Sequence, residues 1–397
     1  MVGAGPVGCV TALALARAGI PVVQFDAALE TPTAHRAATT HSSTLDLLDG
    51  IGMGDAVVAQ GLKAQYFQYR YRETNKVFAE FDFGRLEGET NHPYAVQLEQ
   101  HKTVAIALDM LKAYPHHTLH RPHTAVELTQ GADAARVVTE ATDGTRQTWD
   151  ARYVIGCDGG RSFVRKSQDI DFPGFTWEER FMIVASLFDF ETADAYRYRN
   201  YIADPKLWCS VFKIPGPDGK GMWRNLFPIM SDEPEDVVTS DAWIRARYDE
   251  CFPYARNTPI VHRNIYTVHQ RVAASFRKGR VMLAGDSAHI NNPLGGMGMN
   301  SGIADGINLA EKLIAVWRGE ADDSVFDRYD RQRRPLAQKY VQAQSIQNKE
   351  TLQASDVAAA NKRFEDMART AENPQRHRAF LMNASLINMV REAAAID

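Results

Sequence analysis

The 397-residue sequence predicts an α/β fold, in which a parallel sheet with flanking helices is interleaved with a second, β-rich region and followed by helices. Three observations support this prediction. A glycine-rich loop precedes a helical pattern near the start, short apolar runs end in glycine or aspartate at distant places, and aromatic-rich segments lie between them. Loops of this kind bind ligands at the carboxyl ends of parallel strands. At this length we expect two interlocked domains.

The chain opens with a loop, a helix and a strand. Apolar residues recur at helical spacing from Val10 to Ala18, Gly19 is placed to end this helix, and residues 21–25 are typical of a buried strand. Only Met1 and Val2 precede the first glycine, where nucleotide-binding folds place a full strand. We therefore expect either a start further upstream or a first strand that is largely missing, which would weaken the sheet.

The glycine loop has the spacing of a dinucleotide-binding fingerprint, with Gly3, Gly5 and Gly8. Glycines here allow a tight turn and let a pyrophosphate approach the backbone at a helix N-terminus. Asp26 follows the last glycine by 18 residues, close to the spacing of the acid that binds an adenosine ribose. This acid favours nucleotide binding over a glycine turn that only packs a helix on a strand.

The middle of the chain alternates between sheet and helix signals. Residues 64–83 and 172–266 are aromatic-rich and predict sheet, and residues 99–113 predict a helix. Residues 126–153 indicate a small antiparallel unit bounded by glycine turns. Residues 336–395 are helix-prone and polar.

Two further short strands run into polar motifs. Residues 153–156 precede Asp158-Gly159, and residues 280–284 precede a Gly-Asp-Ser-Ala-His segment that contains Asp286 and His289. Pro293 and a glycine-rich stretch follow, and then a helix is expected from Gly298 to Trp317.

These three blocks together resemble the class A flavoprotein monooxygenases, the group built like para-hydroxybenzoate hydroxylase, across roughly residues 1 to 345. The resemblance implies a Rossmann-like FAD-binding domain with a glutathione-reductase-like parallel sheet, interleaved with a β-sheet substrate domain. It divides the chain into an FAD-binding domain of residues 1–65, 96–170 and 266–345, a substrate domain of residues 66–95 and 171–265, and a C-terminal helical tail of residues 346–397.

The resemblance also implies a role for each matching residue. It places the ADP half of FAD against Gly3, Gly5, Gly8 and Asp26, with Arg36 along the ribose and pyrophosphate. It places Gln100 and Asp286 at the ribityl chain, and Asp158 in a turn associated with FAD and nicotinamide binding. Arg271 matches a position near the nicotinamide approach, although an interdomain salt bridge is an equal interpretation.

The segment from Pro293 to Asn300 is expected to control the flavin chemistry. A helix starting near Gly298 would direct its positive end and the N–H groups of Met299 and Asn300 at the anionic reduced flavin. Each donor would contribute about 1–3 kcal/mol if desolvated. Pro293 would cover the ring face beside the substrate. We expect His289 to fix the loop geometry rather than to act as a base.

No sequence motif identifies the residues that contact the substrate. The eligible residues are His41, Tyr198, Tyr201, Trp208, Trp223, Arg224 and Phe227. Aromatic residues at alternating strand positions pack sheets more often than they bind ligands, so most of these are expected to be core. We nominate Tyr201 as the hydrogen-bond partner that polarises a phenol, and Arg224 as a carboxylate partner.

The implied function is hydroxylation of a small phenolic or N-heteroaromatic ring with NADH or NADPH and O2, through a C4a-hydroperoxyflavin. An FAD-dependent reductase or dehydrogenase without oxygenation, and a non-catalytic FAD-binding protein, remain as alternatives. The Trp-x-Trp-x-Ile-Pro motif of the flavin halogenases, which share the fold, is absent from the sequence. The sequence leaves the substrate, the position of hydroxylation and the choice of nicotinamide open.

Composition bounds the partners and the location. The net charge of -4 and the pI near 6.3 give no basic field for nucleic acid or anionic membranes, and no apolar run reaches the ~20 residues that span a bilayer. Four distant cysteines are expected to be reduced core thiols without a metal. Because no spanning run and no signal segment is evident either, we expect a cytoplasmic location. The tail is expected to pack on the body or to form a homodimer, through Leu381, Leu386, Ile387 and Met389.

Overall fold

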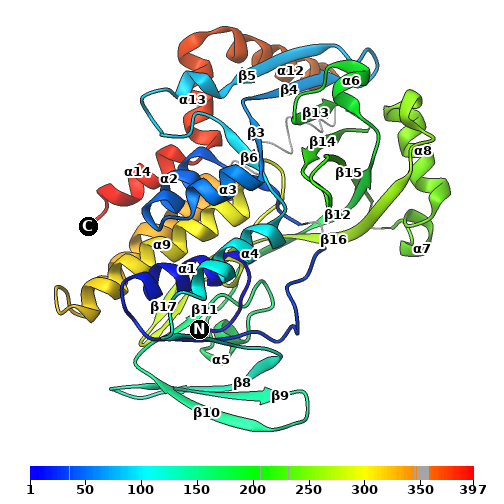
Figure 1. The fold of residues 1–397 in the computed structure, drawn as a ribbon. Coiled ribbons are helices and arrows are strands. Elements are labelled where there is room, and N and C mark those ends of the chain that lie inside the picture. The colour runs from blue at the N-terminus through cyan, green and yellow to red at the C-terminus, as the bar shows by residue number, and fades with distance from the viewer. Residues whose placement is uncertain (35, 206, 231, 344–345, 347–356) are drawn as a thin grey trace.

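The predicted α/β fold is confirmed. The computed structural model describes residues 1–34, 36–205, 207–230, 232–343, 346 and 357–397. Figure 1 shows a central sheet with helices beside it, a small antiparallel sheet at one end and a large sheet at the other. The C-terminal helices return to the body of the molecule, where they lie beside strands and helices from the first quarter of the chain.

The central sheet has the strand order β7, β1, the Val2 position, β11, β18 and β17. Its strands are β1 (Val22–Phe25), β7 (His117–His120), β11 (Val154–Gly156), β17 (Arg277–Lys278) and β18 (Val281–Leu283). Val2 forms parallel bridges with both Phe25 and Gly156, and its amide donates to the carbonyl of Ile155 at 2.9 Å. The segment that was expected to leave the sheet incomplete therefore occupies the position between β1 and β11.

Three helices lie beside this sheet: α1 (Pro6–Arg17), α4 (Gln100–Leu111) and α9 (Met297–Trp317). The approach of α9 to α1 depends on glycine. A Cβ on Gly306 would lie 2.2 Å from Thr11 Oγ1, and one on Gly302 would lie 2.7 Å from Val7 Cγ2. Gly19, with φ +79°, ends α1 as predicted.

The small antiparallel sheet is also as predicted. It consists of β8 (His123–Gln130), β9 (Ala135–Ala141) and β10 (Arg146–Ala151), and the short helix α5 (Phe163–Ser167) contacts β8.

The large sheet has eight strands in the order β19-β16-β12-β15-β14-β13-β4-β5. These are β4 (Tyr66–Tyr71), β5 (Val77–Asp82), β12 (Gly174–Ser186), β13 (Arg199–Ala203), β14 (Cys209–Ile214), β15 (Met222–Ile229), β16 (Ile260–Val272) and β19 (His289–Ile290). Residues 66–82 thus join the later strands in one sheet. Strand β16 runs without a break through position 265, where we placed the end of the substrate domain, and the domain limits stay a prediction.

The β-rich stretch of residues 172–266 also contains helices that the sequence pattern did not identify. They are α6 (Phe190–Asp194), α7 (Glu235–Val238), α8 (Asp241–Cys251) and the 3-10 turn η2 (Pro253–Ala255). The hydroxyl of Ser240 caps α8 by accepting from the Trp243 amide at 3.2 Å. Trp243, Ile244 and Tyr248 are buried on the face that packs against the large sheet.

A third sheet contains β2 (Thr39–Thr40), β6 (Ala95–Gln97) and β3 (Leu62–Ala64), and the helices α2 (Ser42–Gly50) and α3 (Gly54–Gln60) lie between β2 and β3 in the chain. Two 3-10 helices lie elsewhere: η1 (Phe83–Leu86) contacts α13 (Pro374–Ala384), and η3 (Gly285–Ser287) contacts α9 and β19. Strand β2 leads directly into α2, so it places His41 at the junction of the layers.

The C-terminal region is helical, as predicted. Its described elements are α10 (Val325–Leu336), η4 (Ala337–Gln342), α12 (Val357–Glu372), α13 (Pro374–Ala384) and α14 (Ile387–Ala395). Leu381, Leu386, Ile387 and Met389 are all buried within the same chain, so the tail packs on the body. Within the described ranges, no helix has both the length and the apolar character that crossing a membrane requires.

Candidate active site

The glycine loop leaves open space in front of α1. A Cβ on Gly3, which has φ +101°, would lie 2.3 Å from the carbonyl oxygen of Cys157, so packing alone requires glycine there. Gly5 caps α1, and a Cβ on Gly5 would meet no atom within 4 Å. Because a helix N-terminus favours anions, this space fits a pyrophosphate.

Asp26 ties the glycine loop to the end of β1. Its Oδ2 accepts from the Ala4 amide at 2.6 Å, and its Oδ1 accepts from the Ala28 amide at 2.8 Å. Each carboxylate oxygen retains a further lone pair, so the side chain can also accept from a ribose hydroxyl. The ribose contact itself stays a prediction.

Three predicted FAD residues come from distant segments and lie close together. The Gln100 amide donates to the Ala37 carbonyl at 3.1 Å, which puts the start of α4 next to Arg36. Burial raises the pKa of Asp286, and the charges of His289 and Arg36 partly offset this effect. Asp286 is nevertheless exposed to solvent. The Asp286 carboxylate is therefore accessible to a ligand, as the predicted contact with the ribityl chain requires.

Asp158 holds the turn after β11. Its Oδ1 accepts from the hydroxyl of Ser162 at 2.6 Å and its Oδ2 from the Val164 amide at 3.0 Å, and burial raises its pKa. These bonds give Asp158 a positioning role in the turn. A direct contact with FAD or nicotinamide stays a prediction.

The segment from Pro293 to Asn300 forms a tight turn into α9. Gly295 and Gly296 have φ +91° and +71°, and the Gly296 amide donates to the Pro293 carbonyl at 2.9 Å. The helix begins at Met297, one residue before the position we expected. Gly298 and Met299 therefore fall in the first turn, whose amides lack intrahelical acceptors, while Asn300 is the fourth helical residue.

Asn300 contributes through its side chain, which the sequence analysis did not foresee. Its Oδ1 accepts from the His41 amide at 2.8 Å, and its Nδ2 donates to the carbonyls of Thr39 at 2.8 Å and Gly296 at 2.6 Å. His41 Nε2 lies 2.8 Å from the Gly295 carbonyl oxygen. This carbonyl can only accept, so Nε2 carries the proton and donates. These bonds join β2 to the turn before α9.

Several buried polar atoms around this junction have no hydrogen-bond partner among the described residues. They are Thr40 Oγ1, His41 Nδ1, Gln97 Nε2 and Asn292 Nδ2. An unpaired buried polar atom costs about 1–3 kcal/mol, so such a group marks a place where a ligand supplies the missing bonds. An isoalloxazine ring carries donors and acceptors along one edge, and this part of the fold fits it.

The large sheet presents an aromatic wall toward this junction. Tyr201 is buried and stacks on Tyr69 at a centroid distance of 5.0 Å. Arg224 donates from Nη1 to the carbonyl of Arg36, so it connects the large sheet to the segment predicted to bind FAD. The substrate roles proposed for Tyr201 and Arg224 stay predictions.

Strand alternation separates the other substrate candidates. Trp208 belongs to the same core cluster as Tyr201. Trp223 and Phe227 project to the opposite face of β15, where Trp223 contacts Phe190 of α6 at a centroid distance of 5.4 Å and Phe227 contacts Tyr248 of α8 at 6.0 Å. These two residues are therefore core, as expected for most of the candidates.

The sequence analysis missed Arg199, which lies two residues before Tyr201 on β13. It is buried, and its Nε and Nη1 have no hydrogen-bond partner within the described residues. The detectable signal is the alternation of β13, because residues 199 and 201 share one face of the strand.

His41 is a neutral residue beside this cation. Its pKa is lowered to about 3, mainly by burial and also by the charge of Arg199, while the hydrogen bond that its ring donates to the Gly295 carbonyl opposes this shift. Because Nε2 carries the proton, Nδ1 is a hydrogen-bond acceptor without a described partner.

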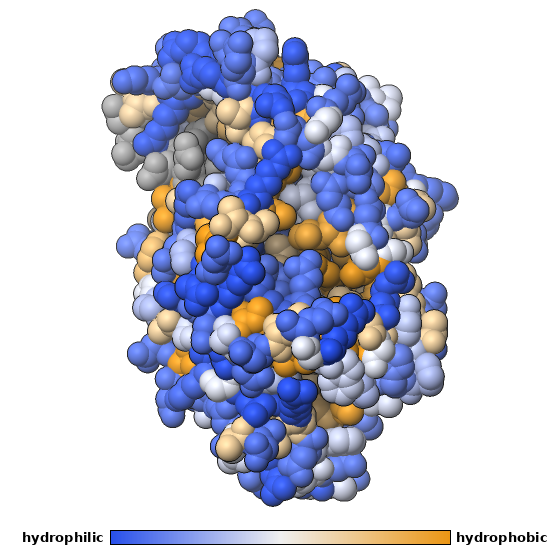
Figure 2. Space-filling view, turned by 90° about the vertical axis from the view of Figure 1, so that its left-hand side faces the viewer, coloured by the Kyte–Doolittle hydropathy of each residue, from blue (hydrophilic) through white to orange (hydrophobic). Residues whose placement is uncertain are grey.

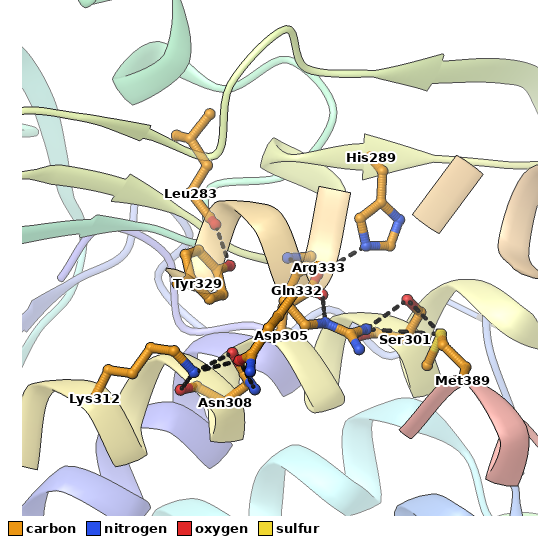
Figure 3. A network of polar contacts seen from close by, with 11 residues as sticks. Leu283, His289, Ser301, Asp305, Asn308, Lys312, Tyr329, Gln332, Arg333 and Met389 are labelled. Carbon is orange, nitrogen blue, oxygen red and sulfur yellow. Dashed lines mark hydrogen bonds and ion pairs between the residues drawn. The ribbon is translucent and has the colours of Figure 1, made fainter. Parts of the chain in front are cut away.

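His289 fixes the loop, as expected. Figure 3 shows its ring directed at Asp305 of α9, with Nε2 2.7 Å from Asp305 Oδ2, and Arg333 of α10 at the other carboxylate oxygen. Arg271 forms no salt bridge with a described residue; it donates to the Phe172 carbonyl at 3.2 Å and to Thr176 Oγ1 at 3.4 Å.

Comparisons with known proteins agree with this geometry. The FAD binding domain family model matches residues 1–344. Para-nitrophenol 4-monooxygenase of Pseudomonas sp. (strain WBC-3) is 33% identical over 365 residues, covering 90% of this chain and 88% of that protein. The 6-hydroxy-3-succinoylpyridine 3-monooxygenase HspB of Pseudomonas putida (strain DSM 28022 / S16) is 33% identical over 339 residues, covering 84% and 83%.

A solved structure extends the likeness to the whole fold. The crystal structure of p-nitrophenol 4-monooxygenase PnpA from Pseudomonas putida DLL-E4 has a TM-score of 0.91 and 30% identity, and the match covers 98% of this chain and 97% of that one. FAD and NAD(P)H are the cofactor and co-substrate of this group. The chain belongs to the FAD-dependent class A aromatic monooxygenases.

Proposed function

We propose that this chain oxygenates a small phenol or hydroxypyridine at a ring carbon that lies para to the hydroxyl and already carries a substituent. The names of two relatives share this pattern: one acts at the carbon of para-nitrophenol that bears the nitro group, the other at the carbon of 6-hydroxy-3-succinoylpyridine that bears the succinoyl group. Each is 33% identical to this chain over most of its length. This supports the same regiochemistry here.

The observation that carries the proposal is the junction between the aromatic wall and the turn before α9. His41 bonds to Asn300 through its amide and to Gly295 through its ring, at 2.8 Å in both cases. We propose that the substrate ring lies between Tyr201 and this turn, with its edge directed at the predicted flavin position. When FAD is bound and reduced by NAD(P)H, it supplies the activated oxygen that such a ring receives.

The residues of this chain bind, orient and keep water out. The first turn of α9, with Gly298 and Met299, stabilises negative charge that develops in front of the helix. Asp286 and Arg36 hold the polar chain of the cofactor. Buried aromatic side chains around Tyr201 exclude water, which protects a reactive oxygen species from unproductive decay.

The test is NADH and NADPH oxidation under air by the FAD-loaded protein, with 4-nitrophenol and with phenol as the unsubstituted control. We expect 4-nitrophenol to accelerate oxidation and to yield one nitrite and one quinone per NAD(P)H. Oxygenation at an unsubstituted carbon would contradict the regiochemistry. NAD(P)H oxidation that produces only hydrogen peroxide with every phenol would favour the reductase alternative.

Two finer expectations also remain proposals. We propose a cytoplasmic location, supported by four cysteines without disulfides, Cys9, Cys157, Cys209 and Cys251. A homodimer gains no support from the tail, since the apolar residues nominated for it are buried in the same chain. A light-scattering mass of one subunit would end the dimer hypothesis.

A further inference from the structure

Arg199 differs from the other buried arginines of the described chain. Arg70 and Arg165 donate to backbone carbonyls, Arg224 donates to the carbonyl of Arg36, and Arg333 pairs with Asp305 at 2.7 Å. Arg199 is 3% exposed, and no carboxylate or carbonyl within the described residues accepts from it. A buried cation without a counter-ion costs several kcal/mol, and the fold retains it here.

The immediate surroundings of Arg199 are aromatic and uncharged. Its guanidinium carbon lies 5.2 Å from the ring centroid of Phe67 and 5.8 Å from those of Phe83 and Phe212. These rings supply weak cation–π attraction, which does not replace an anion. The described surroundings therefore leave the positive charge of Arg199 uncompensated.

The titratable neighbours of Arg199 do not provide negative charge either. Burial raises the pKa of the Tyr69 hydroxyl, with Tyr201 adding to the rise and Arg199 opposing it, so Tyr69 stays protonated. His41 is neutral because its pKa is lowered to about 3. Neither Tyr69 nor His41 therefore supplies the negative charge that Arg199 lacks.

Arg199 also lies where a substrate ring is expected. It shares a face of β13 with Tyr201, and its strand neighbour Phe212 pairs with Arg224 in the next strand. The charge of Arg199 contributes to the lowered pKa of His41, and the His41 ring bonds to Gly295 in the turn before α9. A ligand beside Arg199 is therefore within the space bounded by the aromatic wall and the predicted flavin position.

We propose that Arg199 selects the ionised form of the phenol by binding its ring oxygen, so that the substrate is taken up as a phenolate. This inference rests on the proposed function and specifies the charge state of its substrate. A phenolate provides the missing counter-ion, and its ring is richer in electrons at the para carbon than that of the neutral phenol. The guanidinium is a positioning and specificity-determining group, and no proton transfer from Arg199 is required.

The binding test uses FAD-loaded protein without NAD(P)H, titrated with 4-nitrophenol across pH and followed by the yellow phenolate absorption. In the wild type, bound 4-nitrophenol is expected to remain ionised below the pH at which the free phenol protonates. Arg199→Met is expected to abolish that shift and to weaken phenolate binding about tenfold to a hundredfold, as for a lost charge-assisted hydrogen bond. Arg199→Lys is expected to restore part of both effects.

Matched ligands and a matched variant complete the design. 4-Nitroanisole, which cannot ionise, is expected to bind the wild type and Arg199→Met equally. Arg197→Met is the control, because Arg197 lies two residues away but pairs with Glu80 at 2.9 Å, and it is expected to bind phenolate as the wild type does. If the binding of 4-methoxybenzoate depends on Arg199 as strongly as the binding of 4-nitrophenol does, Arg199 binds the group para to the ring oxygen. That result would overturn the assignment of the ring oxygen as its partner.

Thermal stability separates a substrate role from a structural one. Removing an uncompensated buried charge is expected to raise the Tm of the ligand-free Arg199→Met protein and to abolish the Tm increase that 4-nitrophenol causes in the wild type. A fall in Tm with unchanged phenolate binding would overturn the inference. If no phenol is oxygenated but phenolate binding still depends on Arg199, the proposed reaction fails and this inference stands.

Discussion

The ring of His289 donates to Asp305, with Nε2 2.7 Å from Oδ2, and both side chains are almost fully buried. The Gly285 amide reaches the same oxygen at 3.1 Å. The motif after β18 and the helix α9 are therefore fixed to each other through one carboxylate. Burial alone would raise the pKa of Asp305, but its interactions with His289 and with Arg333 at the other oxygen outweigh this effect and lower the pKa.

Replacing this carboxylate should strongly destabilise the protein. Asp305→Asn leaves Arg333 buried without a counter-ion, and we expect a loss of about 3–5 kcal/mol in the free energy of unfolding. The measurement is chemical denaturation of the FAD-loaded protein. Asp366→Asn is the control, because its pair with Arg369 at 2.7 Å is exposed and should cost less than about 1 kcal/mol. Equal losses in the two variants would contradict the assignment.

Gly5→Ala should separate folding from cofactor binding. The added methyl meets no protein atom within 4 Å but occupies the space in front of α1. We expect apo-protein stability within about 0.5 kcal/mol of wild type and FAD affinity at least about tenfold lower, measured by flavin fluorescence titration. Gly3→Ala should instead prevent folding, since its Cβ would lie 2.3 Å from a backbone carbonyl. Unchanged FAD affinity in Gly5→Ala would rule out a pyrophosphate at this position.

His41 should make stability depend on pH in mildly acidic solution. In the unfolded chain this histidine binds a proton near pH 6.5, whereas the folded protein resists protonation down to about 3. Stability is therefore present above pH 6.5 and is lost as pH falls through this window, by up to about 1.4 kcal/mol per pH unit. The free energy of unfolding, measured by chemical denaturation between pH 7 and pH 4, should fall less with decreasing pH in His41→Gln than in the wild type. An equal pH dependence in the two proteins would refute this prediction.

Asn300→Ala should loosen the turn that precedes α9. It removes three hydrogen bonds: the buried His41 amide loses its side-chain acceptor, and the carbonyls of Thr39 and Gly296 each lose a donor. We expect FAD to dissociate at least about tenfold more readily, because each unpaired group costs about 1–3 kcal/mol. Asn388→Ala, which alters a bond on an exposed residue at 2.6 Å, is the control and should retain FAD normally. Equal retention by both variants would show that Asn300 does not support the flavin site.

Local signals predicted much of the fold. The helix that ends at Gly19, the strands that precede Asp26 and Asp158, and the antiparallel unit of β8–β10 each depend on periodicity and turns within a few residues. Helix α8 was missed because its aromatic residues resemble those of the neighbouring strands. Its cap, Ser240, becomes evident only when the Trp243 amide is seen to bond to it.

The site residues that belong to a sequence motif could be predicted. Those whose position depends on the register between neighbouring strands could not. Asp286 and Arg36 were named from motifs, and the structure brings them close enough to affect one pKa. The burial of Arg199 depends on Phe212 opposite it and on Phe67 of β4, which lies more than a hundred residues earlier in the chain. The alternation of β13 places Arg199 on the same face as Tyr201, but no local pattern identifies these two distant neighbours.

Figure 2 shows that, on the face it displays, apolar residues reach the surface in patches between polar ones, because most apolar side chains are covered in the folded protein. An unfinished chain is different. The bond between His41 and Asn300 joins positions 259 residues apart, and β11 needs β18 as a neighbour. While the ribosome is still translating the large sheet, the apolar residues of α1 lack the partner that α9 later supplies. We therefore expect flavin capture to be a late event in biogenesis, because the cofactor can be retained only after translation has passed residue 300.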